Sequence, residues 1–376
     1  FNGTIDELSV YNAVLTNATI REHWLLAKSM TAPADPPAVP AIILDTDMAT
    51  DVDDVGDLAV LHALMNNDEC TIAGIITSAN LTYSAPCCYA INDYYNRASI
   101  PIGAYQGSAL TGAASSEYAQ TIRDEFGIAS DVRTNYDDAT DAYRQMLHDA
   151  TDGKVVIVMT GLGQCFADLL ASTADGIDSR SGIDLVSAKV AFVEICAGVM
   201  PTGTAEYNIA NGPAQAFADI FDDCPVPIVV CGIELGNTVE TQPPGGANPS
   251  TNPIKRAFDL WDIIHDVPRE AWGQLAVLHA VRGPSSYFDW GGVSGTMTID
   301  AGDGDNSWSA SAGNTSYLTK LATDAELVTV LDALLAQDPE AAPSGSQQGP
   351  AYASASNAAL AAAHSASSVP LSILGG

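Results

Sequence analysis

The chain has 376 residues, 47% of them hydrophobic, and its 46 acidic residues against 14 basic ones give a formal net charge of −32. This length and apolar content suffice for a sizeable buried core and exclude a disordered polymer. The negative field repels nucleic acid and anionic membrane surfaces and attracts cations. The simpler interpretation of this charge excess is a solvated acidic surface that keeps the protein soluble. No run of 18 apolar residues is present, so we predict no membrane span.

The first thirty residues form a compact amphipathic segment that contains FNGTIDELSVYNAVLTNATIREHW. This pattern resembles the last strand and closing turn of a laminin-G/concanavalin-like jelly-roll domain, without the rest of that sandwich. A lone strand leaves its backbone groups unpaired. We therefore expect residues 1–30 to pack on the main domain, to pair with another chain, or to be the remnant of a longer precursor. Residues 31–40, TAPADPPAVP, predict a semi-rigid Pro-rich linker.

Residues 41–337 alternate strand-like and helix-like patterns. Short, nearly continuous apolar runs are typical of parallel strands buried on both faces, and they occupy residues 41–46, 70–77, 154–160, 189–195 and 227–233. Helical spacing fills the intervals, at residues 57–67, 90–98, 139–150, 164–172 and 213–223. The alternation predicts an α/β domain with an open, mostly parallel, doubly wound sheet that binds ligands at the carboxyl ends of its strands. Residues 338–376 form an Ala/Ser-rich tail, which we expect to be flexible or to dock a partner.

Six aspartates follow the first predicted strand within 13 residues, in the segment DTDMATDVDDVGDLAVLHAL. They are Asp45, Asp47, Asp51, Asp53, Asp54 and Asp57. Carboxylates at this density repel one another unless a cation or a helix N-terminus compensates. Ca²⁺ takes oxygen ligands from such clusters, and the end of a buried strand is where a site belongs, so the pattern favours a metal site. The alternative is that one or two of them cap the following helix and the rest face water.

This acidic segment resembles the D-x-D-P-G-x-D-D-A signature of inosine/uridine-type nucleoside hydrolases, with M-A-T in place of P-G-x and two added residues before the Asp pair. It is most similar to a subgroup of secreted, hydrolase-like proteins with the form D-T-D-M-G-x-D-x-D-D. The resemblance implies an open α/β sheet, bound Ca²⁺ and a secreted or cell-surface location. It also implies that Asp47 is a metal ligand and water-activating base, that Asp54 is the second metal ligand, and that Asp53 holds a ribose hydroxyl.

Three further matches to this family follow in the expected order. IITSAN places Asn80 where the family has a ribose-contacting Asn. VVIVMTGLGQ resembles the family's T-G-P-L-T-N turn, which implies that the Thr160 backbone carbonyl binds the metal. AEYNIANGPAQA resembles E-F-N-I-x-x-D-P-E-A-A, which implies that Glu206 and Asn208 lie against the sugar. Together the four matches extend over more than 160 residues and make the fold expectation strong.

The chain departs from the family near the end of the domain. The family's H-D-P-x-A-V motif, whose Asp binds both metal and ribose, corresponds here to EAWGQLAVLHAV, with Trp272 and Gly273 in place of His and Asp. Loss of that carboxylate is expected to weaken Ca²⁺ binding and substrate orientation together. Glu270, Asp266 and Asp289 are candidate substitutes from nearby.

Candidates for two other roles are few. The leaving base of an N-glycoside needs a proton, commonly from His or water. No histidine stands in a matching motif position. His265 and His279, which lie on helical patterns, are the candidate proton donors. Seven cysteines lack CxxC spacing, and their odd number leaves at least one unpaired. The vicinal Cys87-Cys88 pair has no accompanying His motif, and the sequence assigns no disulfide.

Two functions from different classes therefore remain open. The first is a secreted, Ca²⁺-dependent hydrolase of the N-glycosidic bonds of ribonucleosides or related glycosides. The second is a catalytically impaired homologue that serves as an extracellular binding or self-assembling protein, joined as a homo-oligomer or polymer through its termini; Gly273, the lone N-terminal strand and the long tail favour it. A third function, as a carbohydrate-binding module, is supported only by the resemblance of the N-terminal segment to a jelly-roll domain.

Overall fold

The computed structural model describes residues 35–107, 118–265 and 267–340. The laminin-G-like segment 1–30, residues 31–34 of the predicted linker and the tail from residue 341 lie outside the described residues. The predicted domain boundaries therefore stay predictions, although the last helix, α12 (Asp324–Leu335), ends close to the predicted end of the domain. No helix in the described parts of the chain is long and apolar enough to cross a membrane.

An eleven-stranded sheet runs through the molecule in the order β4-β3-β2-β1-β5-β6-β8-β13-β11-β12-β7. The first eight strands in that order are parallel to their neighbours, and the last three pair antiparallel. The parallel strands are β4 (Asp137–Asp138), β3 (Ile102–Ala104), β2 (Thr71–Thr77), β1 (Ala41–Thr46), β5 (Val155–Met159), β6 (Val190–Ile195), β8 (Ile228–Val230) and β13 (Thr315–Lys320). The prediction of an open, mostly parallel sheet is confirmed.

The antiparallel end of the sheet was not predicted. It contains β11 (Phe288–Ile299), β12 (Asn306–Ala310) and β7 (Thr202–Gly203). A separate two-stranded ribbon pairs β9 (Glu240–Thr241) with β10 (Arg269–Glu270). This ribbon lies directly before the helix that carries Gly273, so it fixes how the chain enters that helix.

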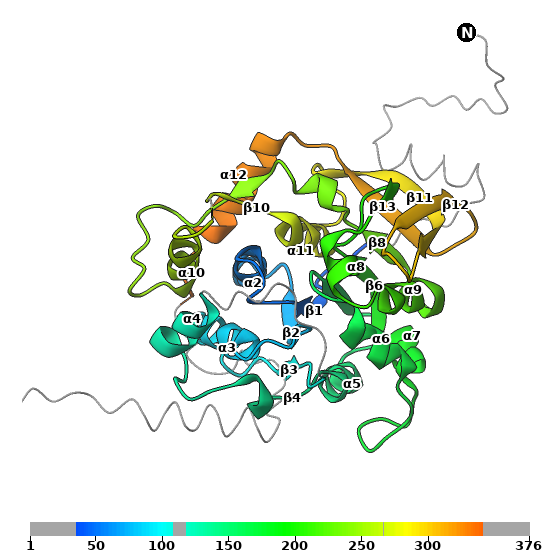
Figure 1. Cartoon of the computed structure of the whole chain (residues 1–376), viewed down its shortest axis with the longest axis horizontal. Coiled ribbons are helices and arrows are strands. Elements are labelled where there is room, and N and C mark those ends of the chain that lie inside the picture. Colours follow the sequence, from blue (N-terminus) through cyan, green and yellow to red (C-terminus); the bar gives the residue numbers. More distant parts are fainter. Residues whose placement is uncertain (1–34, 108–117, 266, 341–376) are drawn as a thin grey trace, which may run out of the picture.

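Helices cover both faces of the sheet (Figure 1). One face carries α2 (Asp53–Asn66), α3 (Ser84–Tyr94), α4 (Ala119–Phe126), α10 (Pro253–Trp261), α11 (Trp272–Arg282) and α12. The other carries α5 (Ala139–Asp149), α6 (Gln164–Ala171), α7 (Gly182–Lys189) and α9 (Ala214–Asp223). Short helical turns complete the chain: η1 (Arg133–Asn135), α8 (Tyr207–Asn211) and η2 (Ile233–Leu235).

Strand β1 shows why the sequence folds as a two-sided core. Its side chains alternate between faces, so Ile42 and Leu44 join one core cluster while Ile43 joins the other. Burial on both faces requires an almost unbroken apolar run, which is what the sequence provides. Because β2 and β5 flank β1 in parallel register, the residues after all three strands meet at one edge. That edge holds the polar residues of the candidate site.

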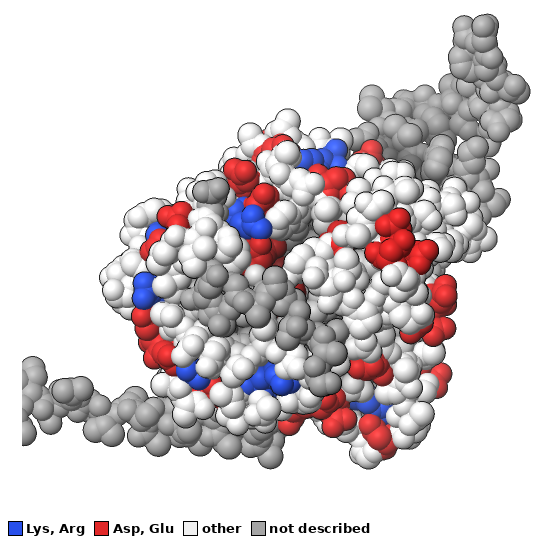
Figure 2. All heavy atoms as spheres, in the orientation of Figure 1, with Lys and Arg blue, Asp and Glu red and all other residues white. Residues whose placement is uncertain are grey.

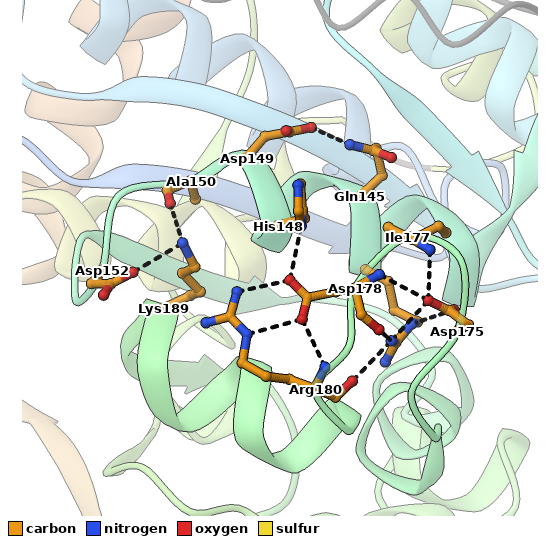
Figure 3. Close-up of polar contacts among 11 residues, drawn as sticks. Gln145, His148, Asp149, Ala150, Asp152, Asp175, Ile177, Asp178, Arg180 and Lys189 are labelled. Carbon is orange, nitrogen blue, oxygen red and sulfur yellow. Dashed lines mark hydrogen bonds and ion pairs between the residues drawn. The ribbon is translucent and has the colours of Figure 1, made fainter.

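A polar network fixes the loop between α6 and α7 (Figure 3). Asp178 accepts hydrogen bonds from the Arg180 side chain and from His148 Nδ1, at 2.8 Å each for the closest pairs. Buried Arg144 donates to both oxygens of Asp175, at 2.6 and 3.0 Å. The acidic groups here are satisfied by protein partners, so this cluster has a structural explanation.

Candidate active site

The loop after β1 folds back over the start of α2. The Thr50 hydroxyl donates to Asp47 Oδ2 at 2.7 Å, and the Thr46 hydroxyl donates to Asp54 Oδ1. Ala49 has a φ of 87°, a left-handed conformation that glycine adopts more readily. Its N–H donates to the Tyr118 hydroxyl at 2.9 Å, and that hydroxyl donates to the Asp51 carbonyl at 2.6 Å. Tyr118 therefore holds the loop in this strained shape.

The loop and the first turns of α2 bury three carboxylates together. Asp47, Asp54 and Asp57 are 4%, 3% and 1% exposed. Burial, followed by the charges of Asp51 and Glu206, raises the pKa of Asp47 to about 7. Burial and the charges of neighbouring aspartates hold the pKa of Asp54 and of Asp57 well above the usual range. The three carboxylates are near enough to one another for their charges to raise these pKa values.

Several oxygens of these carboxylates have no hydrogen-bond partner. They are Asp54 Oδ2 and both oxygens of Asp57. Buried carboxylate oxygens are normally paired or bind a metal ion, because leaving them bare is costly. The donor set suits a hard cation such as Ca²⁺. Within the described ranges, no group of three or more His, Cys, Asp or Glu side chains has the arrangement of a metal site, so backbone or water oxygens would have to complete the coordination.

The backbone after β5 supplies one such oxygen. The Thr160 carbonyl accepts a hydrogen bond from Asn208 Nδ2 at 3.1 Å, and the same amide donates to the Cys196 carbonyl at 2.9 Å. Asn208 thus joins the ends of β5 and β6. A carbonyl has two lone pairs, so this bond leaves Thr160 able to bind a cation as well.

Glu206 lies within electrostatic reach of Asp47 and caps α8. Its carboxylate accepts from the N–H groups of Asn208, Gly198 and Ile209, at 3.1, 3.0 and 3.3 Å. Burial raises its pKa, and these backbone donors lower it. The capping contacts give Glu206 a structural function; its predicted contact with a sugar stays a prediction.

The two remaining predicted residues lie at the rim. Asp53 is partly buried, and burial together with the charges of Asp51, Asp57 and Asp47 holds its pKa well above the usual range. Asn80, after β2, is also partly buried and donates from Nδ2 to the Gly107 carbonyl at 2.6 Å. The structure thus places Asp53 close to the buried carboxylates and Asn80 at the end of the neighbouring strand.

The start of α11 closes the site from the opposite side. Arg269 donates from Nε to both oxygens of Asp51, at 2.9 and 3.1 Å, and its guanidinium lies 4.9 Å from the Trp272 ring centre. Trp272 Nε1 donates to Asn237 Oδ1 at 2.8 Å. The adjacent Gly273 faces Asp57: a Cβ built at this glycine would lie 2.5 Å from Asp57 Cγ. Acidic and basic side chains also meet in a crease near the middle of the face seen in Figure 2.

The two candidate proton donors differ in position. His279 is fully buried, donates or accepts through Nδ1 to Glu194 at 2.8 Å, and is surrounded by aromatic rings, so it belongs to the core. His265 is exposed and stacks on Trp261 with ring centres 4.0 Å apart. Trp261 in turn lies 5.9 Å from the Arg269 guanidinium. Of the two, His265 therefore borders the acidic loop.

All seven cysteines lie within the described residues, and each is a buried free thiol. Burial raises the pKa of the Cys87 thiol, which opposes a nucleophilic function for that pair. Cys196 and Cys231 follow adjacent strands β6 and β8 and interact with each other.

Sequence analysis missed two residues of the site. Asp57 was part of the acidic cluster but received no function of its own, although it follows Asp54 by three residues on a predicted helix and therefore shares its face. Arg269, the cation that pairs with Asp51, is adjacent to Glu270 in sequence and carried no motif.

No protein-family model matches the sequence, and no curated protein matches it. Solved structures do. An inosine–uridine preferring nucleoside hydrolase from Bacillus anthracis matches with a TM-score of 0.57 and 13% identity, over 79% of this chain and 100% of the other. A plant nucleoside hydrolase matches with a TM-score of 0.57 and 17% identity, over 80% and 99%.

The type III effector protein XopQ, in complex with adenosine diphosphate ribose, matches with a TM-score of 0.55 and 17% identity, over 86% of this chain and 99% of the other. These likenesses confirm the predicted fold. At such identities they establish fold and leave activity to be argued from the site.

Proposed function

We propose that this chain, which has the fold of nucleoside hydrolases, is a secreted, cation-dependent hydrolase of the N-glycosidic bonds of ribonucleosides or related N-ribosides. One observation carries the proposal: Asp47 and Asp54 are buried together after the central strand β1, and Asp54 Oδ2 has no protein partner. Perturbed, desolvated carboxylates at the carboxyl edge of a parallel sheet are typical of functional sites. Secretion is proposed from the sequence resemblance alone.

Asp47 is the group best placed to act as general base. Its burial gives it a pKa of about 7, near the optimum for accepting a proton at neutral pH. In the proposed reaction water attacks the anomeric carbon, Asp47 takes the proton of that water, and the bond between the sugar and the base breaks with its electrons leaving on the base. The transition state has oxocarbenium character. Asp53 at the rim would orient a ribose hydroxyl, and the departing base takes a proton from solvent or from His265.

Asp47, Asp54 and the Thr160 carbonyl would hold the Ca²⁺ ion. When bound, the ion supplies positive charge that offsets the buried carboxylates and acidifies a nearby water. Thr46 and Thr50 orient the two carboxylates through the hydrogen bonds described above, so the ligand geometry is partly set before any cation arrives.

Release of free base is the direct test. Purified protein is incubated with inosine, uridine, adenosine and ADP-ribose, with Ca²⁺ or with EDTA, and products are separated chromatographically. We expect the free base (hypoxanthine, uracil or adenine) to appear with Ca²⁺ and to be lost with EDTA and in Asp47→Asn. Asp289→Asn, an exposed aspartate on β11, is the matched control and should keep full activity. No release from any of these substrates by the wild type would refute the proposal.

A second function is favoured by Gly273, which lacks the carboxylate of the family motif: an extracellular binding protein without turnover. It predicts that nucleosides or ADP-ribose bind, as measured by calorimetry, and that no base is released. The same purified protein therefore distinguishes the two functions.

A further inference from the structure

Position 273 and Asp57 compete for one space. A Cβ built on Gly273 would overlap Asp57 Oδ2 and would lie 2.5 and 2.7 Å from Asp57 Cγ and Oδ1. Real Cβ atoms do not approach other heavy atoms this closely, so a side chain at 273 would displace the Asp57 carboxylate from its present position. The carboxylate that enters this space comes from α2, and the residue on α11 opposite it is the one residue type that leaves the space free.

A second glycine of the same two helices, Gly56 on α2, is in close contact with a side chain of α11. A Cβ on Gly56 would lie 2.9 Å from the Gln274 side-chain carbonyl carbon, so here α11 provides the side chain and α2 the glycine. The two helices are therefore in close contact at two consecutive pairs, Gly56 with Gln274 and Asp57 with Gly273. At this crossing either helix can supply a side chain to the space between them, but only one at a time.

Asp57 has no charged partner that explains its burial. It is 1% exposed, neither oxygen has a hydrogen bond of normal geometry, and no side chain caps the N-terminus of α11 beside it. The Thr160 hydroxyl is near enough to lower its pKa, but burial and the neighbouring carboxylates outweigh this effect. Arg269, on strand β10 before α11, forms its ion pairs with Asp51 and Glu270. An isolated buried carboxylate is unfavourable unless a counter-charge reaches it or it takes up a proton.

We propose that Asp57 is a ligand of the cation site and replaces, from α2, the carboxylate that Gly273 does not provide from α11. The three carboxylates as they lie do not have the arrangement of a metal site, so their side chains would turn toward the cation when it binds. This inference rests on the proposed function, because the cation is the one that Asp47 and Asp54 would hold. It adds a residue to that site: where the family's motif has a carboxylate on the later helix, this chain offers one from α2. Of the candidates from sequence, Glu270 pairs with Arg269 and Asp289 is exposed, while Asp266 lies outside the described residues.

A set of variants tests the exchange through Ca²⁺ binding and thermal unfolding. Asp57→Ala should bind Ca²⁺ at least about tenfold more weakly than wild type in calorimetry, by analogy with the effect of losing groups that support a metal site. Asp57→Asn keeps the size and should show the same loss, which separates charge from packing. Gly273→Asp alone should lower the melting temperature, because its side chain meets Asp57. The exchange variant Asp57→Ala with Gly273→Asp should recover most of the Ca²⁺ affinity and the melting temperature.

Melting in EDTA gives a readout that needs no activity. Without a cation, Asp57→Asn should melt above wild type, because wild type must either keep Asp57 ionised or protonate it in order to bury it. With Ca²⁺ the order should reverse. Asp289→Asn should behave as wild type in both conditions.

The outcomes separate this inference from the proposed function. If wild type binds Ca²⁺, Asp47→Ala abolishes binding and Asp57→Asn binds as wild type, then Asp57 is no ligand and the inference is overturned while the cation site stands. If binding depends on Asp57 but no base is released, the inference holds and the hydrolase proposal fails. If wild type binds no Ca²⁺, both are overturned.

Discussion

His62 anchors the middle of α2, the helix that carries Asp54 and Asp57. It is fully buried, its Nδ1 lies 3.0 Å from Arg97 Nη1 and its Nε2 lies 2.8 Å from Asn92 Oδ1. A guanidinium only donates, so Nδ1 is the acceptor and Nε2 carries the proton. Burial and the Arg97 charge lower the pKa of His62 to about 3 from an ordinary value of 6.5. The neutral ring therefore ties α2 to α3 and to the residues after it.

The lowered pKa makes this anchor sensitive to acid. As the pH falls below 6.5, the unfolded chain binds a proton at His62 before the folded chain does, so stability falls with pH down to about 3. The slope is about 1.4 kcal/mol per pH unit, so that His62 alone removes about 3 kcal/mol between pH 7 and pH 4.5. In His62→Gln, which cannot titrate, this part of the acid sensitivity should disappear.

Urea unfolding of wild type and His62→Gln at pH 7 and pH 4.5 measures the effect. The variant should be the less stable protein at pH 7, because the fit to Asn92 and Arg97 is changed. The unfolding free energy of wild type minus that of the variant should be about 3 kcal/mol lower at pH 4.5 than at pH 7. Asp289→Asn controls for unrelated titration. An equal difference at both pH values would show that His62 takes up its proton equally in both states, and the reasoning would be wrong.

Two further predictions concern backbone strain and the α6–α7 loop. Ala49→Gly should raise the free energy of unfolding by about 0.5–1 kcal/mol, since relief of the 87° φ exceeds the added entropy of the unfolded chain; a loss of stability in urea unfolding would contradict this. Arg144→Lys should lower it by about 3 kcal/mol, because lysine keeps the charge but cannot serve Asp175 together with the carbonyls of Asp178 and Arg180; an unchanged urea midpoint would contradict that.

The parallel half of the fold could be predicted because its signal is local. Strand β1 was predicted at its observed bounds, Ala41–Thr46, since burial on both faces leaves an unbroken apolar run. Strand β3 has three residues and β4 has two, too few for any pattern. The long strand β11 has glycines within it and irregular register against β13, so its alternation is weak. Pairing at that end of the sheet depends on contacts distant in sequence, which periodicity does not report.

The candidate site was predictable to the extent that its residues follow strands. Asp47, Asn80 and Thr160 come directly after β1, β2 and β5, and parallel pairing brings the ends of those strands to one edge. The function of Glu206 as the cap of α8, and of Asn208 as the donor to the Thr160 carbonyl, needed coordinates because neither contact has a fixed sequence spacing. The same is true of Arg269, which reaches Asp51 across 218 positions.

Gly273 shows how a comparison along the sequence and a comparison in space lead to different conclusions. Along the sequence, glycine at this position is the loss of a ligand, and it favours an impaired homologue. In space, a side chain at 273 would collide with the Asp57 carboxylate, so an aspartate there would force that carboxylate out of its present position. The number of carboxylates offered to the pocket is then unchanged, and only the helix that offers the last one differs. Burying a carboxyl between α2 and α11 destabilises the fold, whether it stays ionised or must first take up a proton. A cation that binds Asp57 would offset this cost, so the buried carboxyl is an argument for a pocket that binds a cation.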